Sequence, residues 1–134
     1  MKSWTENIIQ HWKTAGISLN KGALIEMIAE TEQALGFRFP GEFMELYLQM
    51  DGFTHMESTG NMYSIWPIHR ILSEYRKSGN RNFIGFACLP GNNHTIGFLK
   101  NSSGIFKSSD QQCCIVDTFK ESIVLMCKDP QLLC

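Results

Sequence analysis

The sequence predicts an α+β domain whose antiparallel β-sheet carries its helices mainly on one face. Two observations and one packing rule support this class. Apolar residues recur at helical spacing before residue 51 and again near the C-terminal end. Between Met62 and Val116, short β-type segments alternate with turn residues, as hairpin-linked strands do. Helices grouped before and after such strands typically pack against one face of their sheet.

The first helix is predicted to begin at a capping box, S-x-x-E, in which Ser3 and Glu6 satisfy free N–H groups of the first turn. Apolar residues then follow at intervals of four, and Gly16 supplies a natural C-terminal stop. The residues of this apolar face are Trp4, Ile8 and Trp12.

A second helix is expected over Lys21–Leu35, with Gly36 at its end. Glu32 lies on the apolar stripe of this helix, where an unpaired carboxylate is costly. We therefore expect Glu32 to accept free N–H groups at the start of the third helix, where the helix dipole favours an anion, and not to act in catalysis. The apolar stripe consists of Ile25, Ile28 and Leu35.

The third helix is expected over Pro40–Met50. Pro40 suits the first helical position, because the N–H that proline lacks would have no intrahelical partner there. Asp51-Gly52 is expected to close this helix. The side chains expected on its buried side are Phe43, Tyr47 and Met50.

The second half of the chain is expected to form the sheet. Met62–Trp66 is predicted to be a strand that Pro67 ends. A short helix is predicted to start at Ile68 and to end in the Ser78-Gly79-Asn80 turn. Asp117 is a suitable N-cap for the last helix, expected over Asp117–Cys127. The remaining predicted strands are Phe83–Cys88, Thr95–Leu99, Ile105–Lys107 and Cys113–Val116.

Length and composition fit one domain over residues 1–134, since a chain of this size buries a core without needing a metal or a disulfide. No apolar run is long enough to span a membrane, and the N-terminus lacks the features of a signal peptide. The five cysteines are odd in number and contain no C-x-x-C pair. Reduced thiols in a cytoplasmic protein are the simplest interpretation.

The sequence offers no expected catalytic residue, metal site or cofactor. It has no H-E-x-x-H, Walker, G-x-S-x-G or G-x-G-x-x-G motif, and its four histidines lack ligand spacing. Cys88 beside a histidine would make a nucleophile pair, but a buried apolar cysteine is the favoured interpretation. Basic residues are scattered and aromatic residues fall at core spacings, so no direct contact with nucleic acid is expected.

Residues 28–52 resemble the opening signature of the SUKH superfamily of Smi/Knr-like proteins. That signature has a Glu, a Leu-Gly pair, Leu-Pro, an aromatic residue, a short apolar helix and Asn-Gly. Phe39 stands where Leu is usual, and Asp51 where Asn is usual. Looser similarities extend the resemblance over residues 20–127. The matching residues are Glu32, Leu35-Gly36, Pro40, Phe43, Tyr47-Leu48 and Gly52.

The resemblance implies an α+β fold without an active site. Its bacterial members are mostly immunity proteins that neutralise polymorphic toxins, often nucleases, so a cognate toxin domain is the expected partner. The alternative is an intracellular regulatory or scaffold domain of the same fold. A third class is a small-ligand binder with a pocket near Trp66. We expect a monomer or a weak dimer with no membrane partner.

Charge suggests where a partner binds. Residues 1–60 carry eight acidic and four basic side chains, whereas residues 61–134 carry five acidic and eight basic ones. Because nucleases grip phosphates, they tend to be basic, and an acidic inhibitor gains association rate. The expected binding face follows the third helix, and its residues are Glu45, Asp51, Phe53, Glu57 and Trp66.

The loop after Gly52 is expected to expose Phe53, His55 and Met56 as the apolar centre of this face. In the alternative interpretation the acids only keep the protein in solution. For Trp66, filling the core is the favoured interpretation and anchoring a partner is the alternative. The motif residues Glu32, Gly36, Pro40 and Gly52 are expected to serve the fold.

Overall fold

The computed structural model describes residues 3–54, 63–89, 94–108 and 114–128. The elements in chain order are α1 (Trp4–Thr14), β1 (Leu19–Lys21), α2 (Ile25–Leu35), α3 (Gly41–Tyr47), β2 (Met50–Phe53), β3 (Ser64–Ile65), α4 (Ile68–Ser78), β4 (Phe83–Cys88), β5 (Thr95–Leu99), β6 (Ser102–Lys107) and α5 (Phe119–Lys128). β1 pairs with β2, and the other strands form an antiparallel sheet in the order β3-β4-β5-β6. The predicted α+β class is confirmed.

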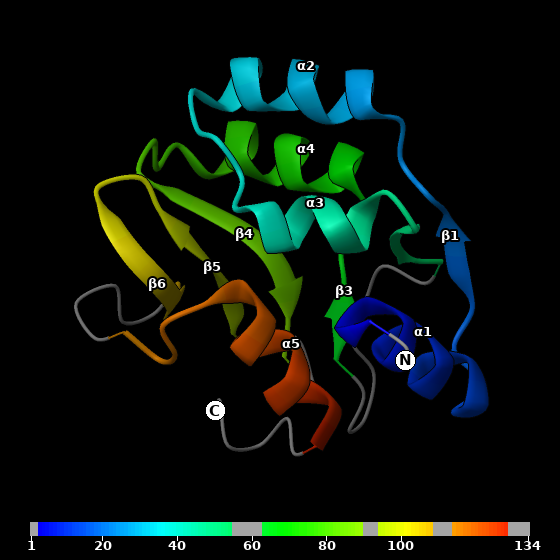
Figure 1. Ribbon diagram of the computed structural model, residues 1–134. Coiled ribbons are helices and arrows are strands. Elements are labelled where there is room, and N and C mark those ends of the chain that lie inside the picture. The colour runs from blue at the N-terminus through cyan, green and yellow to red at the C-terminus, as the bar shows by residue number, and fades with distance from the viewer. Residues whose placement is uncertain (1–2, 55–62, 90–93, 109–113, 129–134) are drawn as a thin grey trace.

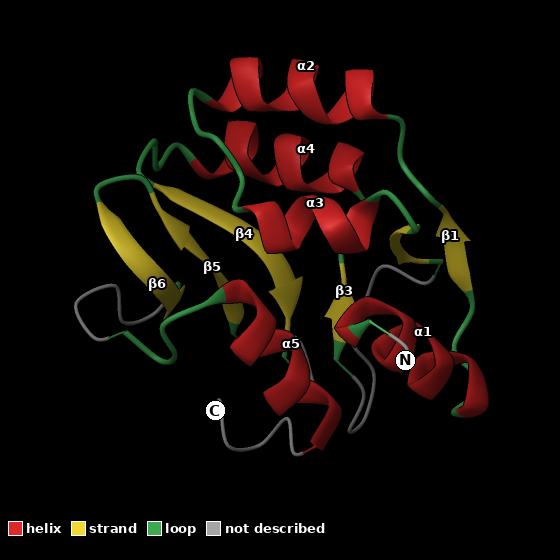
Figure 2. Ribbon diagram, in the orientation of Figure 1, coloured by secondary structure: helices red, strands yellow, loops and turns green. Residues whose placement is uncertain are grey.

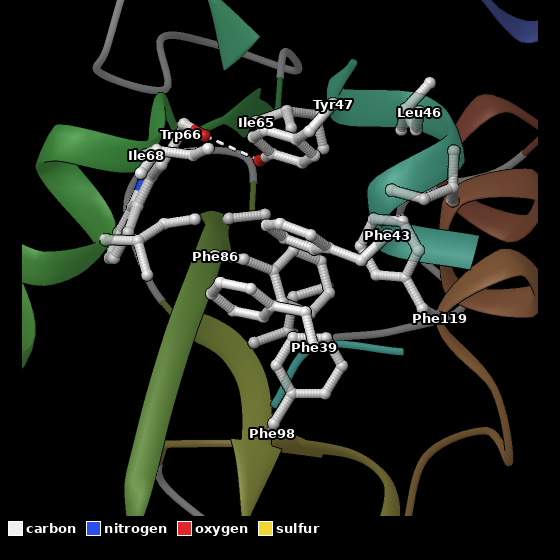
Figure 3. Packing of buried hydrophobic residues seen from close by; sticks show 14 of the residues in the cluster. Phe39, Phe43, Leu46, Tyr47, Ile65, Trp66, Ile68, Phe86, Phe98 and Phe119 are labelled. Carbon is white, nitrogen blue, oxygen red and sulfur yellow. Dashed lines mark hydrogen bonds between the residues drawn. The ribbon is translucent and has the colours of Figure 1, made fainter. Parts of the chain in front are cut away.

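An aromatic core joins the helices to the four-stranded sheet. Figure 1 shows α3 and α5 in front of this sheet, and Figure 2 shows α2 and α4 lying beside each other above α3. The ring centroid of Phe119 in α5 lies 5.0 Å from that of Phe86 in β4 and 5.3 Å from that of Phe43 in α3. Phe98 of β5 lies 5.1 Å from Phe86, so rings from four elements meet at one place (Figure 3). Each such pair adds about 0.5–1.5 kcal/mol beyond area burial.

The start of α1 is the predicted one. Ser3 Oγ accepts a hydrogen bond from the backbone N–H of Glu6 at 3.3 Å, and the helix ends before Gly16. Trp12 is fully buried and donates from Nε1 to the hydroxyl of Tyr63 at 2.7 Å. This bond fixes α1 to the segment that leads into β3.

The sequence analysis did not predict the two short strands β1 and β2. α2 begins at Ile25, because the predicted start, Lys21, belongs to β1. α3 ends at Tyr47, because Met50 belongs to β2. Ile25 is 54% exposed, so its predicted place on the buried stripe is also wrong. Strands of three and four residues give too little alternation to be distinguished from the helix that follows or precedes them.

In the second half of the chain β4 and β5 have the predicted bounds. β3 is limited to Ser64–Ile65, and the predicted start of that strand at Met62 lies outside the described residues. The last predicted strand, Cys113–Val116, contributes an isolated bridge between Val116 and Ile105 rather than a strand. Cys113 itself lies outside the described residues.

The cap of α5 lies one residue later than predicted. Thr118 Oγ1, not Asp117, accepts a hydrogen bond from the N–H of Glu121 at 3.1 Å. The Glu121 carboxylate lies 3.2 Å from the same hydroxyl. Both residue types are good N-caps, so sequence alone does not separate adjacent candidates.

Glu32 fixes the turn between α2 and α3. Its Oε2 accepts a hydrogen bond from the N–H of Phe39 at 2.7 Å. Phe39 directly precedes Pro40, which is the N-cap of α3 and not its first helical residue. Gly36 ends α2 in the left-handed conformation, with φ 69°, and so allows the chain to turn back toward Glu32. Glu32 therefore has a structural role, as expected, but the N–H group that donates to it belongs to the residue before the N-cap of α3.

A second set of contacts, which we call the α3–α4 junction, joins Tyr47, Asp51 and Gly52 to Trp66, Pro67 and Ile68. Tyr47 donates its hydroxyl proton to the carbonyl oxygen of Trp66 at 2.6 Å. Gly52 has φ 77°, and a Cβ there would overlap the backbone of Pro67. Only glycine combines this backbone angle with such a close approach at no steric cost.

Asp51 caps α4 from the same junction. Its Oδ1 accepts a hydrogen bond from the N–H of Ile68 at 2.8 Å, and the residue is 9% exposed. Burial raises the pKa of Asp51 above its ordinary value of 3.8, against the lowering effects of the Ile68 N–H and of His69. The cap thus carries a charge that is costly to bury. Asp51 was expected to close α3 and instead lies in β2.

Asp51→Asn is expected to retain the Ile68 hydrogen bond without the buried charge, whereas Asp51→Ala leaves that N–H unpaired. At pH 7 the Ala variant should lose about 1–3 kcal/mol of unfolding free energy, and the Asn variant should match or exceed the wild type. Urea unfolding of the three proteins gives these values.

The contribution of Asp51 to the unfolding free energy depends on pH in one direction. Because the folded-state pKa of Asp51 is raised, its contribution to stability is greatest below pH 3.8 and falls as pH rises through the folded-state pKa. The advantage of Asp51→Asn should therefore shrink on going from pH 7 to pH 4. An Asn variant as unstable as the Ala variant would contradict this account of the cap.

Candidate partner-binding surface

The structure separates the five residues of the predicted binding face. Glu45 is exposed on α3, but Phe53 is fully buried, and Trp66 and Asp51 are 4% and 9% exposed. Glu57 lies outside the described residues, as do His55 and Met56. The expected exposure of Phe53 and Asp51 is wrong.

The burial of these residues has local causes. Phe53 packs edge-on against Trp12, with ring centroids 5.0 Å apart, because β2 is buried along its whole length between β1 and β3. Asp51 points at the start of α4. Trp66 fills the core, which is the interpretation that the sequence favours, and its carbonyl oxygen accepts a hydrogen bond from Tyr47. Of the predicted face, Glu45 is the described residue that a partner can reach.

The solvent side of α3 carries residues at helical spacing. Glu42, Glu45 and Gln49 recur at intervals of three and four, and Leu48 lies beside them at the C-cap. Residues spaced in this way are neighbours on one helix face. Glu45, Leu48 and Gln49 are exposed, and Glu42 is partly exposed.

α1 borders this side of α3. Trp4 donates from Nε1 to Oε2 of Glu45 at 2.9 Å. Gln49 donates from Nε2 to the hydroxyl of Thr5 at 2.6 Å and to the carbonyl oxygen of Glu45 at 3.0 Å. The indole of Trp4 is only partly buried, so it offers an aromatic edge next to a carboxylate.

α5 borders the other end of α3. The N–H of Lys120 donates to Oε1 of Glu42 at 3.1 Å, and the Lys120 ammonium lies 5.9 Å from the centroid of the Trp4 ring. A groove at this place is lined by Glu42 of α3 and, from α5 and the segment before it, by residues that include Lys120 and Glu121. The apolar side chains that line this groove are Val116, Val124 and Leu125.

The exposed large hydrophobic residues in the described part of the chain gather at one corner, beside the end of α3. Leu24, Ile25 and Leu48 are 68%, 54% and 43% exposed. The corner forms because the N–H of Ala23 donates to the carbonyl of Tyr47 at 2.8 Å. Apolar side chains thus lie on both sides of the two acids of α3.

We call these residues together the α3 surface: Trp4, Leu24, Glu42, Glu45, Leu48, Glu121 and Val124. Within the described residues, the ion pair present joins Arg70 to Glu74 and involves none of these acids. Glu42 and Glu45 accept hydrogen bonds from neutral N–H groups instead. Lys120 also lines the groove, so Glu42, Glu45 and Glu121 stand against one basic side chain and the α3 surface stays acidic on balance.

Of the residues of this surface, only Glu45 belongs to the binding face expected from the sequence. Trp4 was assigned to the buried face of α1, although its indole N–H needs a partner and so favours the helix edge. Leu48 falls between Tyr47 and Met50 and off the buried stripe of α3, and that position is a usable signal of exposure. The groove against α5 depends on a contact between residues far apart in sequence.

In the four described segments, no three His, Cys, Asp or Glu side chains gather closely enough to hold a metal ion. None of the helices in these segments is both long and apolar enough to cross a bilayer. The fold and the α3 surface thus define an α+β domain whose most distinctive described feature is an acidic face flanked by apolar side chains.

A comparison with protein-family models identifies that class more closely. The model of the SMI1 / KNR4 family (SUKH-1) matches residues 22–128, and the chain belongs to this family. The resemblance inferred over residues 20–127 is confirmed. A search of curated proteins gives no match.

Glu32 and Glu45 make a matched pair of acids, one structural and one at the surface. Glu32→Ala should lower the unfolding free energy by about 1–2 kcal/mol, because it leaves the N–H of Phe39 without its charged acceptor. Glu45→Ala should change it by about 0.5 kcal/mol or less, because water replaces the carboxylate at an exposed site. Urea unfolding at pH 7 measures both, and equal losses would show that the α3 surface is part of the stabilising framework.

Proposed function

We propose that this chain is a bacterial immunity protein that binds and neutralises a polymorphic toxin, of nuclease type, in the cytoplasm of the cell that produces it. It acts as one domain over residues 1–134, by stoichiometric contact and without catalysis. Membership of the SUKH-1 family supports an immunity-type role. The observation that carries the proposal is the α3 surface, where Glu42 and Glu45 have no basic partner among the described residues.

The chemistry of the α3 surface favours a basic protein partner. A nuclease neutralises phosphates with Lys and Arg side chains, and the same side chains would pair with Glu42 and Glu45. Exposed charges of this kind mainly raise the association rate and make it depend on salt. Fixed negative charge also disfavours direct binding of this face to nucleic acid.

The apolar residues of the α3 surface would set how long the complex lasts. Differences in affinity between related complexes arise mostly from dissociation rates, which buried anchors control. Leu48 and Leu24 at one end, and Val124 at the other, present apolar area beside the charges. Trp4 adds an aromatic side chain at the centre, already held by Glu45.

Charge reversal tests the proposed face. The double variant Glu42→Lys/Glu45→Lys should bind the toxin domain encoded beside this gene at least about tenfold more weakly than wild type, with a smaller dependence on salt. Glu26→Lys/Glu30→Lys is the matched control, since it makes the same charge change on the exposed side of α2. Calorimetric titration at two salt concentrations gives both quantities.

Two outcomes would reject the proposal at different levels. If both double variants, shown to be folded by urea unfolding, bind the toxin as wild type does, the α3 surface is not the binding face. If the gene has no toxin gene beside it, and the chain gives no protection to cells that express the toxin, the immunity role itself fails. A regulatory or scaffold role of the same fold then becomes the better hypothesis.

A further inference from the structure

A pocket lies where the segment between α2 and α3, strands β5 and β6, and the start of α5 meet. Its cavity volume is about 260 Å³. Phe98, Ile105 and Phe119 line it and are each 4% exposed or less, so they form its floor. Figure 3 shows Phe98 and Phe119 among the packed rings of the core. The pocket is therefore an opening in the surface that leads down to the aromatic core.

β6 contributes little side-chain bulk to this pocket. Ser102 and Ser103 line it and are exposed. Gly104 lines it as well, with φ 103°, and a Cβ there would overlap Sγ of Cys114. Glycine adopts this backbone conformation without strain, and a residue with a Cβ does not. β6 thus presents hydroxyls and bare backbone to the pocket.

Among the described residues, the charged side chains that line the pocket are both acidic. Asp117 is exposed, and its carboxylate has no hydrogen bond or ion pair within the described part of the chain. Glu42 is partly exposed, and its Oε1 accepts a hydrogen bond from the backbone N–H of Lys120, which is a neutral group. Both negative charges are therefore reachable from the pocket and have no cation as a partner there.

The basic side chains of the neighbouring segments are placed elsewhere. The ammonium of Lys120 lies 5.9 Å from the centroid of the Trp4 ring, and that of Lys100 donates to the hydroxyl of Tyr75 at 2.7 Å. Arg38 is exposed and is not among the residues that line the pocket. A recess with acids at its edge and no cation in its lining attracts a positively charged group.

An aromatic ring at the pocket favours a guanidinium over an ammonium. Phe37 lines the pocket and is partly exposed. Its ring centroid lies 5.3 Å from that of Phe98, so it continues the aromatic floor toward solvent. A cation within about 6 Å of such a ring is attracted to its face. A guanidinium is planar, more weakly hydrated than an ammonium, and pairs with carboxylates through several N–H groups at once.

The size of the pocket favours a single side chain over a larger ligand. A cavity of roughly 150 Å³ holds one benzene ring, and pockets for drug-sized ligands measure roughly 300–1,000 Å³. The volume of about 260 Å³ lies between these values. Glu42 belongs both to this pocket and to the α3 surface, so a protein bound to that surface has its own side chains next to the pocket.

We propose that this pocket receives an arginine side chain of the protein partner. The guanidinium would lie against Phe37 and donate hydrogen bonds to the carboxylates of Asp117 and Glu42. The inference rests on the proposed function, because it takes the partner to be a basic protein bound at the α3 surface. It adds to that surface a recessed anchor, and arginine is one of the residue types that most often carry the binding energy of an interface.

Nα-acetyl-arginine methylamide is the probe, since the guanidinium is its one charge. Titration into the full-length ¹⁵N-labelled protein should shift the backbone N–H resonances of Gly104 and Thr118, which line the pocket. The matching lysine derivative should bind about threefold more weakly, because an ammonium is more strongly hydrated and does not stack. The matching citrulline derivative has nearly the same shape without the charge and should bind about tenfold more weakly.

Two variants separate charge from space. Asp117→Asn should weaken binding of the arginine probe about fivefold, whereas Glu121→Gln, which removes an exposed charge of α5 outside this pocket, should not. Ser103→Tyr should block the pocket without changing its charge, at a strand position that suits tyrosine. Asn101→Tyr is its matched control, since Asn101 is exposed just before β6 and does not line the pocket.

The same variants are then titrated against the toxin domain encoded beside this gene. Ser103→Tyr and Asp117→Asn should each weaken that complex by about tenfold, and Asn101→Tyr should bind as wild type does. The proposal is overturned if the arginine probe shifts neither resonance, or if it binds no more tightly than the citrulline derivative. It is also overturned if the probe binds but both pocket variants hold the toxin as wild type does, because the pocket is then a site for small guanidinium compounds.

These outcomes are distinct from failure of the proposed function. If the wild-type chain binds the toxin and the pocket variants bind it equally well, the arginine pocket alone is wrong. If the wild-type chain binds no toxin, the immunity role is wrong, and the arginine of a toxin falls with it.

Discussion

The hydrogen bond from the hydroxyl of Tyr47 to the carbonyl of Trp66 holds together two parts of the molecule that form far apart in sequence. It ties the C-terminal end of α3 to the start of α4, and Asp51 and Gly52 complete the same α3–α4 junction. Both ends of this bond are buried, so losing either one would leave a polar group without water or partner. The side of α3 that faces solvent and the position of the Trp66 indole both follow from it.

The family motif is made largely of these framework residues. Glu32 holds the turn before α3, Gly36 ends α2, and Gly52 allows the backbone of Pro67 to approach. None of the three belongs to the α3 surface. A motif of this kind specifies a scaffold and leaves the exposed positions free to differ, which is how one fold serves many partners.

The sequence predicts long or strongly patterned elements well and short buried ones poorly. β4 and β5 have the expected bounds, because each is flanked by turn residues. β2 was read as the end of a helix and an exposed loop, because its burial comes from pairing with β1 and from the contact of Phe53 with Trp12. Glu45 was found from charge alone, whereas the neighbours that make it a surface come from α1 and α5. Contacts of this range leave no local pattern in the chain.

The three tryptophans lie in three different environments. Trp4 is partly exposed on the α3 surface, Trp12 is fully buried on the inner side of α1, and Trp66 is buried with the guanidinium of Arg70 over its ring. The molecule consequently carries its own optical reporters, each in a different dielectric environment. A dissolved quencher such as iodide reaches Trp4 and quenches its fluorescence, but it does not reach Trp12. The emission of the unlabelled protein therefore separates events at the surface from events in the interior.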